Sequence, residues 1–145
     1  RAGIRTGCLD LDQVGLCYPA TEGDPDNHQV KARNFGAVWP NFRAAGVRCL
    51  VVSGGVDTPD RVRTYADLVP GTALTLCRLR AGRGELTRRF VGRGWQIHLA
   101  DETVAESAVL DRLDFAEVCV DTDGLAVPEV ARLVRERAGG WPCLF

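Results

Sequence analysis

The stretch GCLDLDQVG, residues 7–15, joins an apolar run to two acids and a closing glycine. The run Ile4–Leu11 is typical of a β-strand, and Asp10 and Asp12 fall at its carboxyl end. A second stretch, RCLVVSGGVDTP at 48–59, has the same form, because its apolar run is followed by polar residues and glycines. Both stretches therefore predict a strand that delivers polar side chains to one edge of a sheet.

The rest of the chain alternates between apolar runs and helical patterns. The expected strands are Ile4–Leu11, Val47–Val52, Thr72–Leu79 and Glu117–Val120. The expected helices are Asp26–Ala45, Thr58 to about Val69, Gly84–Arg93, Asp101–Leu113 and Val127–Ala138, with Trp95–Leu99 left open. Solidly apolar strands that alternate with helices predict an α/β fold, in which helices sandwich a parallel sheet. We expect residues 1–145 to form a single domain.

Two local signals refine the helices. Thr58-Pro59-Asp60 has the residues of a helix start: a capping side chain, a proline at the first helical position and an acid in the first turn. Pro40 lies inside the expected helix Asp26–Ala45 and should kink or interrupt it, because proline lacks the backbone N–H that a helix interior uses.

Composition excludes several classes of protein. The chain has 145 residues, a net charge of -1 and 26% charged residues, which is ordinary globular composition. A basic excess typical of nucleic-acid binding is absent. No apolar run approaches the roughly 20 residues of a membrane span, and no secretory signal is visible. We expect a cytoplasmic protein with a small-molecule partner rather than a nucleic acid or a membrane.

The six cysteines do not have the spacing of a disulfide framework or a metal site. No C-x-x-C pair exists, and neither histidine lies near a cysteine pair in the sequence. Four cysteines lie singly in strand-like runs and two lie outside them: Cys8, Cys49, Cys77 and Cys119, then Cys17 and Cys143. We expect reduced thiols, most of them buried as small apolar residues.

Polar residues gather at three expected strand ends. In open parallel sheets, ligands bind beyond the carboxyl ends of the strands, so this clustering predicts a binding site. The residues are Asp10, Asp12, Ser53, Gly54, Gly55, Asp57, Asp121, Thr122 and Asp123. Each of them alone could equally belong to an ordinary turn, and Asp12 could merely cap the turn before Gly15.

Asp10 and Asp12 can line one pocket if the residue between them, Leu11, points into the core. Two carboxylates this close repel, so at least one should find a cation, an arginine or a proton. We expect Asp10 to be the more buried, orienting acid and Asp12 to face substrate or magnesium.

An arginine-rich segment follows the third expected strand and contains Arg78, Arg80, Arg83, Arg88, Arg89 and Arg93. A guanidinium group matches the oxygens of phosphate. Four glycines flank and punctuate the segment, at 82, 84, 92 and 94, which predicts a hinged lid over about residues 80–95. A solvated helix face is the alternative.

The order of these motifs resembles the small-molecule kinases of the P-loop superfamily, which include adenylylsulfate, shikimate and gluconate kinases. LDLDQ at 9–13 is similar to their acid pair, and SGG at 53–55 to the glycine turn of shikimate kinases. ARNFGAVWPNFRAAGVRCLVVS at 32–53 resembles a helix and strand of adenylylsulfate kinases. LTRRFVGRG at 86–94 resembles the lid, and VDTDGLAVPEVARLV at 120–134 the last strand and helix.

This resemblance implies ATP-dependent transfer of a phosphoryl group to a small-molecule hydroxyl, with ATP and Mg²⁺ as cofactors. Asp10 or Asp12 would orient or deprotonate the hydroxyl, and Asp12 would hold the metal. The resemblance assigns the other roles as follows: substrate binding to Arg33, Ser53, Gly54, Gly55 and Asp57; phosphoryl charge neutralisation to Arg88, Arg89 and Arg93; and the border of the nucleotide base to Asp121, Thr122, Asp123 and Gly124.

The chain departs from these kinases in one large respect. The G-x-x-x-x-G-K-[ST] loop that cradles ATP phosphates is absent, and no glycine loop precedes Lys31. The opening RAGIR resembles RAAGVR at 43–48, where a helix passes into a strand. We therefore expect a P-loop fold whose N-terminal strand and helix are missing here. These 145 residues should show no measurable ATP turnover and weak nucleotide binding at best.

Two other readings remain open. Asp10 and Asp12 after one strand, with Ser53 after another, also resemble the haloacid-dehalogenase phosphatases, in which the first acid is a nucleophile. The chain could instead be a kinase-like fold kept as a non-catalytic binding module, since a fold does not determine a function.

Overall fold

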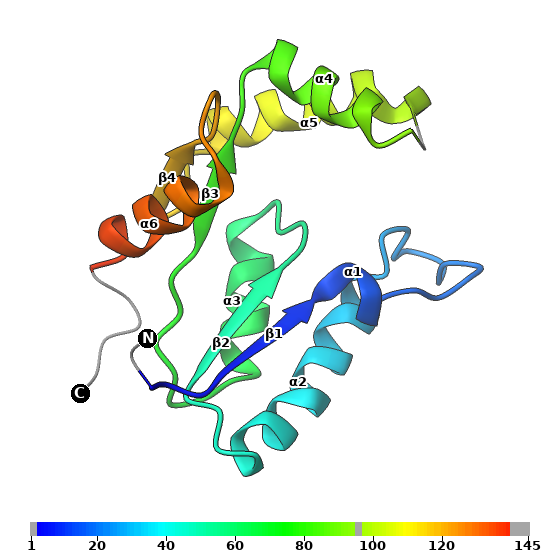
Figure 1. The fold of residues 1–145 in the computed structure, drawn as a ribbon. Coiled ribbons are helices and arrows are strands. Elements are labelled where there is room, and N and C mark those ends of the chain that lie inside the picture. The colour runs from blue at the N-terminus through cyan, green and yellow to red at the C-terminus, as the bar shows by residue number, and fades with distance from the viewer. Residues whose placement is uncertain (1–2, 95–96, 140–145) are drawn as a thin grey trace. The chain divides into compact units, whose positions relative to one another are not determined.

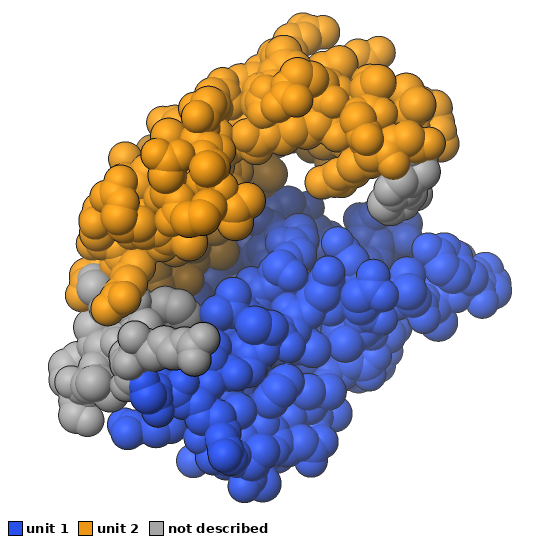
Figure 2. All heavy atoms as spheres, in the orientation of Figure 1, with its two compact units in different colours: residues 1–74 blue, residues 75–145 orange. Residues whose placement is uncertain are grey.

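A computed structural model describes residues 3–94 and 97–139 of the chain. The chain divides into two compact units, residues 1–74 and 75–145 (Figure 2). Each unit contains a two-stranded parallel sheet and its own helices (Figure 1).

Unit 1 has the element order β1 (Thr6–Asp10), α1 (Leu11–Val14), α2 (His28–Ala44), β2 (Cys49–Ser53) and α3 (Pro59–Asp67). The strands β1 and β2 pair in parallel, in a register that runs from Thr6 opposite Cys49 to Asp10 opposite Ser53. As a result, the carboxyl ends of both strands lie at the same edge of the sheet.

The core of unit 1 forms where α2 and α3 meet the start of α1. Its buried members are Leu11, Ala32, Phe35, Trp39, Tyr65 and Val69. The rings of Phe35 and Tyr65 meet edge to face, with 5.6 Å between their centroids. On β1, a Cβ at Gly7 would lie 2.9 Å from side-chain atoms of both Leu50 and Phe42, so the missing side chain lets α2 pack closely on the sheet.

Unit 2 consists of β3 (Cys77–Arg80), α4 (Arg83–Gly92), the 3₁₀ turn η1 (Ile97–Leu99), α5 (Ala100–Leu113), β4 (Val118–Asp121) and α6 (Val127–Arg137). The strands β3 and β4 are also parallel, with Cys77 opposite Val118 and Arg80 opposite Asp121. Val120 on β4 is fully buried. The helices α4 and α5 pack against each other, and α6 packs on β4.

The predicted α/β fold with parallel strands is confirmed; three of the four expected strands form at shorter lengths, and the fourth is shifted by one residue to Val118–Asp121. The described strands pair as two sheets rather than one, and Val51, Val52 and Leu79 remain exposed, so full coverage of the strands by helices is not observed. The strand expected over 72–79 begins at Cys77, and the amide of Thr72 instead bonds the Val69 carbonyl in a turn.

The helix start predicted at Thr58 is confirmed, and the interruption predicted at Pro40 is not observed. Thr58 caps α3, accepting a hydrogen bond from the amide of Arg61 at 3.2 Å, and Pro59 begins the helix. Pro40 does not interrupt α2, which continues to Ala44. A kink at Pro40, which is exposed, stays a prediction.

The cysteine prediction is confirmed in part. The five described cysteines are free thiols, and Cys143 lies outside the described residues. Cys49 is buried and Cys77 and Cys119 are half-buried, but Cys8 and Cys17 are exposed. Side chains alternate along a strand, so Cys8 points away from the core that its neighbours Gly7 and Leu9 face.

Within residues 3–94 and 97–139, no helix combines the length and the apolar content needed to cross a membrane.

The difference in exposure predicts two classes of thiol in the native protein. In a Cys143→Ser background, Cys8 and Cys17 should react with an aromatic disulfide reagent in the folded state, and Cys49 should react only after denaturation. Burial raises the pKa of the Cys49 thiol, which lowers its thiolate fraction further. Cys8→Ser and Cys17→Ser should each remove one fast-reacting thiol. Equal rates for Cys49 and Cys17 in the folded protein would contradict this structure.

Candidate functional site

The strand register of unit 1 brings two predicted site residues together. Asp10 and Ser53 are direct partners across β1 and β2, at the carboxyl ends of both strands. The Asp10 carboxylate also caps α1, because its Oδ1 accepts a hydrogen bond from the Asp12 amide at 2.9 Å. The chain therefore turns from strand to helix immediately after Asp10, and Asp12 lies in the first turn of that helix.

The orientation predicted for Leu11 is confirmed. Leu11 is 2% exposed in the core of unit 1, while Asp10 and Asp12 are both exposed. Gly54 permits this arrangement, because a Cβ there would lie 2.7 Å from the Cβ of Leu11 and its φ of 143° disfavours other residues. Both carboxylates are exposed, so neither is a buried acid, and the assignment of Asp10 as the more buried, orienting acid stays a prediction.

Asp12 has the cationic partner that the sequence argument required, and it is Lys31 of α2. The Lys31 Nζ lies 2.8 Å from Asp12 Oδ1, and the lysine side chain is 13% exposed against 62% for the aspartate. The lysine stem crosses Gly15, where a Cβ would lie 2.3 Å from Lys31 Cγ. Sequence reasoning set Lys31 aside because no glycine loop precedes it. The signal that it missed is Gly15, whose lack of a side chain leaves the path open.

The other substrate-binding candidates of unit 1 are placed differently. Arg33 follows Lys31 by two residues, about 200° around the helix, and lies on the exposed side of α2. The helix therefore separates Arg33 from the Asp12–Lys31 pair. Gly54 and Gly55 continue from Ser53 at the end of β2. The Asp57 carboxylate forms an ion pair with the guanidinium of Arg61, four residues later, at 2.5 Å.

In unit 2, polar residues at the end of β4 and just after it bind the end of β3 and the turn that follows β3. Asp121 accepts two hydrogen bonds from Arg80, at 2.9 and 3.1 Å. The Asp123 carboxylate accepts the amide of Gly82, at 3.0 and 3.1 Å from its two oxygens. A Cβ on Gly82 would lie 2.7 Å from Asp123 Oδ2, so this contact requires glycine. Gly124 follows with a φ of 70°.

Thr122 links three elements of unit 2 through one buried hydroxyl. The residue is 5% exposed, and its hydroxyl donates to the Arg80 carbonyl at 2.8 Å. Arg89 of α4 donates to the same hydroxyl at 2.8 Å and to the Thr122 carbonyl at 3.0 Å. The hydroxyl is thus a donor to β3 and an acceptor from α4, and it fixes the start of the loop after β4.

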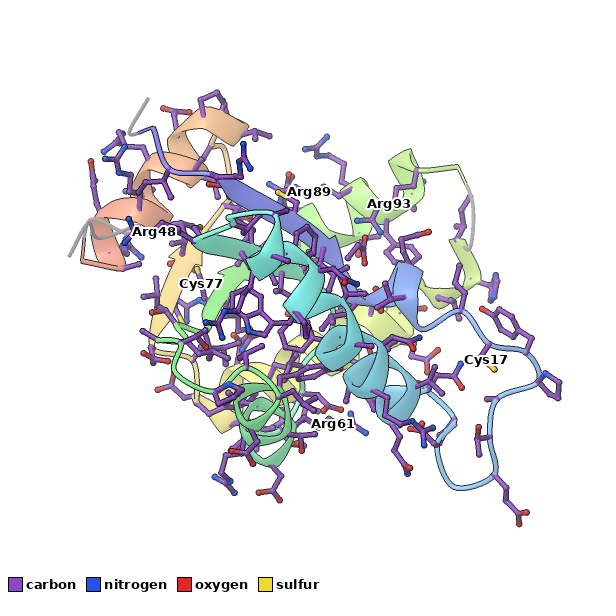
Figure 3. The ribbon with its side chains drawn as sticks, turned by 90° about the horizontal axis from the view of Figure 1, so that it is seen from below. Cys17, Arg48, Arg61, Cys77, Arg89 and Arg93 are labelled. Atoms are coloured by element: carbon purple, nitrogen blue, oxygen red, sulfur yellow. The ribbon has the colours of Figure 1, made fainter. Side chains whose placement is uncertain are left out.

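The predicted lid arginines form the surface of α4, which begins just after the carboxyl end of β3. Arg88 donates two hydrogen bonds to Glu85 at 2.8 and 2.7 Å, and Arg89 donates one to the same carboxylate at 2.5 Å. The guanidinium of Arg93 lies 5.5 Å from the centroid of the Phe90 ring. Figure 3 labels Arg89, on this helix, and Arg93, the residue that follows its last turn. Phosphate binding by these arginines stays a prediction.

The carboxylates of the described residues suit one mode of magnesium binding, in which the protein supplies only one or two of the ligands. Among the described residues, no three His, Cys, Asp or Glu side chains converge as a set of metal ligands. Mg²⁺ is often held by one or two carboxylates, with water and substrate phosphates completing its octahedron. Asp12, exposed at a strand end, fits that sparse arrangement.

The Thr122 contacts predict a specific loss of stability. Thr122→Val preserves shape but removes two hydrogen bonds of the hydroxyl, while the Arg80 carbonyl keeps the Thr122 amide and Arg89 keeps the Thr122 carbonyl and Glu85. Each lost hydrogen bond should destabilise the fold by about 0.5–1.5 kcal/mol. Chemical denaturation of the full chain measures the loss. The matched control is Thr87→Val on the exposed face of α4, which should change stability by less than about 0.5 kcal/mol. Equal stability of the two variants would contradict the linking role.

The Glu85 contacts predict a dependence on acid. Hydrogen bonds from Arg88 and then Arg89 lower the pKa of Glu85 from an ordinary 4.5 to about 2. A carboxyl group with a lowered folded-state pKa stabilises the fold fully above its unfolded pKa, and the stabilisation is lost as pH falls. The difference in stability between wild type and Glu85→Gln should therefore shrink between pH 4.5 and about 2. A difference that is constant across this window would contradict the contact.

No protein-family model and no curated protein matches this chain. Among solved structures, the chain is similar to the tunicamycin resistance protein of Deinococcus radiodurans. The likeness has a TM-score of 0.59 at 14% identity, and it covers 92% of this chain and 82% of that one. At this identity it shows the fold, which is kinase-like and agrees with the coarse α/β prediction. Membership of the P-loop superfamily stays a prediction.

Proposed function

We propose that this chain belongs to an ATP-dependent phosphotransferase that acts on the hydroxyl group of a small molecule. The observation that carries the proposal is the Asp12 carboxylate, exposed at the carboxyl end of β1 and held 2.8 Å from Lys31 Nζ. A carboxylate in this position can orient an acceptor hydroxyl and receive its proton. The kinase-like fold of the similar solved structure supports the same class of reaction.

The two carboxylate oxygens of Asp12 would have separate roles. Oδ1 accepts from Lys31, and Oδ2 has no hydrogen-bond partner in the part of the chain that the structure describes. The lysine contact fixes the rotation of the carboxylate, and the Asp10 cap fixes the backbone on which it stands. Oδ2 would then face the acceptor hydroxyl and take its proton as the oxygen attacks phosphorus.

The remaining roles follow from charge. ATP supplies the phosphoryl group when bound and would leave as ADP. In the alternative assignment, Asp12 would contribute one carboxylate ligand to Mg²⁺, and Asp10 would take the proton of the acceptor. Ser53, beside Asp10 at the sheet edge, would donate a hydrogen bond to the acceptor. The sequence resemblance adds Arg33, Gly54, Gly55 and Asp57 to acceptor binding.

The same resemblance places the other proposed residues in unit 2. Arg88, Arg89 and Arg93 would balance phosphoryl charge, and the loop over residues 121–124 would border the nucleotide base. Because Arg89 already binds Thr122, its part in this scheme would be to hold that loop in position.

A phosphatase is the second candidate, because Asp10 and Ser53 are direct neighbours across the two strands. In that scheme, Asp10 would attack the phosphorus of a phosphomonoester and Ser53 would bind a phosphate oxygen. Release of inorganic phosphate without ATP, abolished by Asp10→Asn, would favour this candidate.

Asp12→Asn tests the phosphotransferase directly. We expect a loss of about a hundredfold or more in transfer, the size typical of a positioned acid or base. The assay follows labelled phosphate from ATP into the small-molecule fraction of a cell extract, using the protein as it occurs in the cell. Asp67→Asn, at the exposed end of α3, is the control and should retain full activity.

Asp10→Asn separates capping from chemistry, because asparagine caps a helix as well as aspartate does. It should leave stability nearly unchanged, so any loss of transfer reports on the charge of Asp10. If Asp12→Asn retains activity within about threefold of wild type, the assignment of Asp12 as acid or base is wrong.

A further inference from the structure

The loop over residues 15–27 joins α1 to α2, and one carboxylate fastens its end to the first turn of α2. Asp24 is 6% exposed, and its carboxylate accepts the backbone amides of His28 and Gln29 at 2.8 and 2.9 Å. The end of the loop is therefore tied to the helix through Asp24. We call this part of unit 1, residues 24–31, the α2 junction.

Two consecutive residues of the α2 junction are poorly satisfied. The backbone of Asn27 is left-handed, with a φ of 54°. The Asn27 Oδ1 and the His28 Nδ1 are both buried, and neither has a hydrogen-bond partner in the part of the chain that the structure describes. Buried polar atoms without a partner destabilise a fold, so the junction should open more readily than the strands of the same unit.

Neutral His28 fits the α2 junction, and protonated His28 does not. Its side chain is 14% exposed, and its Nε2 faces the Asp26 carboxylate at 3.8 Å. That carboxylate favours the proton on Nε2, which leaves Nδ1 as a bare acceptor. The imidazolium form carries a proton on both nitrogens, so it would add a buried N–H at Nδ1 that none of the described groups accepts.

The charges around His28 also favour the neutral ring. Arg61 of α3, labelled in Figure 3, lines the same hollow as His28, and Lys31 follows His28 by one turn on α2. The carboxylates of Asp57 and Asp26 oppose these two cations. Burial and then the cations outweigh the carboxylates, so the pKa of His28 is lowered from 6.5.

The other titratable groups at the α2 junction are occupied or neutral. The Asp24 carboxylate is shared between two backbone amides. Tyr65 of α3 is neutral near pH 7, because burial raises the pKa of its hydroxyl above 10.0. His28 is also the first residue of α2, where the helix dipole disfavours a positive charge.

We propose that His28 makes the α2 junction a pH-sensitive switch, which is closed near neutral pH and opens in mild acid. Opening would let the protonated ring turn into water and would release Asp24 and Asn27 from the first turn of α2. The amide of Lys31 bonds the Asn27 carbonyl at 2.8 Å, so opening would also loosen the lysine that holds Asp12. The switch needs neither ATP nor a substrate, and it therefore stands apart from the phosphotransfer proposal.

The direction of the effect follows from proton linkage. In the open form, His28 takes up a proton near its ordinary pKa of 6.5, and in the closed form only at a lower pH. Between these two values the open form binds more protons, so the closed form loses stability as the pH falls through that window. Well above pH 6.5 both forms are neutral, and the closed form keeps its full stability.

Hydrogen exchange on the full chain measures the opening. Protection factors, corrected for the intrinsic effect of pH, should fall at least about threefold over residues 24–31 between about pH 7.5 and about pH 5. The amides of β2 should keep their protection, because that strand carries no histidine. Equal losses of protection in β2 and in the α2 junction would mean general acid unfolding and would overturn the proposal.

His28→Gln is the decisive variant, because glutamine takes up no proton in this range. Its protection over residues 24–31 should be the same at both pH values, whereas His98→Gln, at the exposed histidine of unit 2, should behave as wild type. Arg61→Gln removes a cation that disfavours the imidazolium and should weaken the acid effect. Arg63→Gln, at an exposed arginine of the same helix, is the matched control and should not.

An NMR titration of the His28 ring in the wild-type chain keeps the proposal testable if His28→Gln does not fold. The ring should titrate at a lower pH in the folded chain than in the chain unfolded by urea. The proposal is overturned if the two titrations coincide, or if His28→Gln loses protection in acid as wild type does.

Discussion

The parallel register of β1 and β2 is the constraint on which the candidate site depends. Asp10 stands opposite Ser53, so two polar strand ends meet at one edge of the sheet. The chain can leave that edge as a helix only because Asp10 caps it and Leu11 enters the core beneath Gly54. Asp12 is then held one step further on, where Lys31 reaches it from α2. A shift of one residue in the pairing would exchange the buried and exposed faces of β1 and separate these groups.

Unit 2 uses the same kind of strand ends for a different purpose. Its two aspartates and the buried Thr122 are occupied by Arg80, Gly82 and Arg89, which belong to the strand and helix next to them. In unit 1, the Asp12 carboxylate keeps an oxygen for another partner. Acidic residues after a strand therefore have two uses in one chain. Which use applies depends on how many hydrogen-bond donors the neighbouring elements supply to the carboxylate.

This contrast explains how far the sequence could be interpreted. Apolar runs and the cap at Thr58 predicted the strands and helices, because those signals are local. Leu11 is buried as the argument from strand alternation required, but for another reason, because it is the first residue of α1 rather than part of β1. The contact of Lys31 with Asp12 could not be predicted in the same way, because it joins side chains from α1 and α2 and neither spacing nor residue type determines it. The Glu85 contacts of α4, in contrast, have the i,i+3 and i,i+4 spacing of ordinary helix pairs, a local signal that the lid interpretation passed over.

The close approach of Gly54 to Leu11 also bears on how such a chain can vary through evolution. The two positions lie on different elements, yet a Cβ at 54 would occupy the space of the leucine side chain. Gly82 and Asp123 are coupled in the same manner. An amino-acid substitution at one member of either pair is tolerated only with a matching substitution at its partner. Descendants of this sequence should therefore inherit these pairs jointly, even where the surrounding residues have diverged beyond recognition.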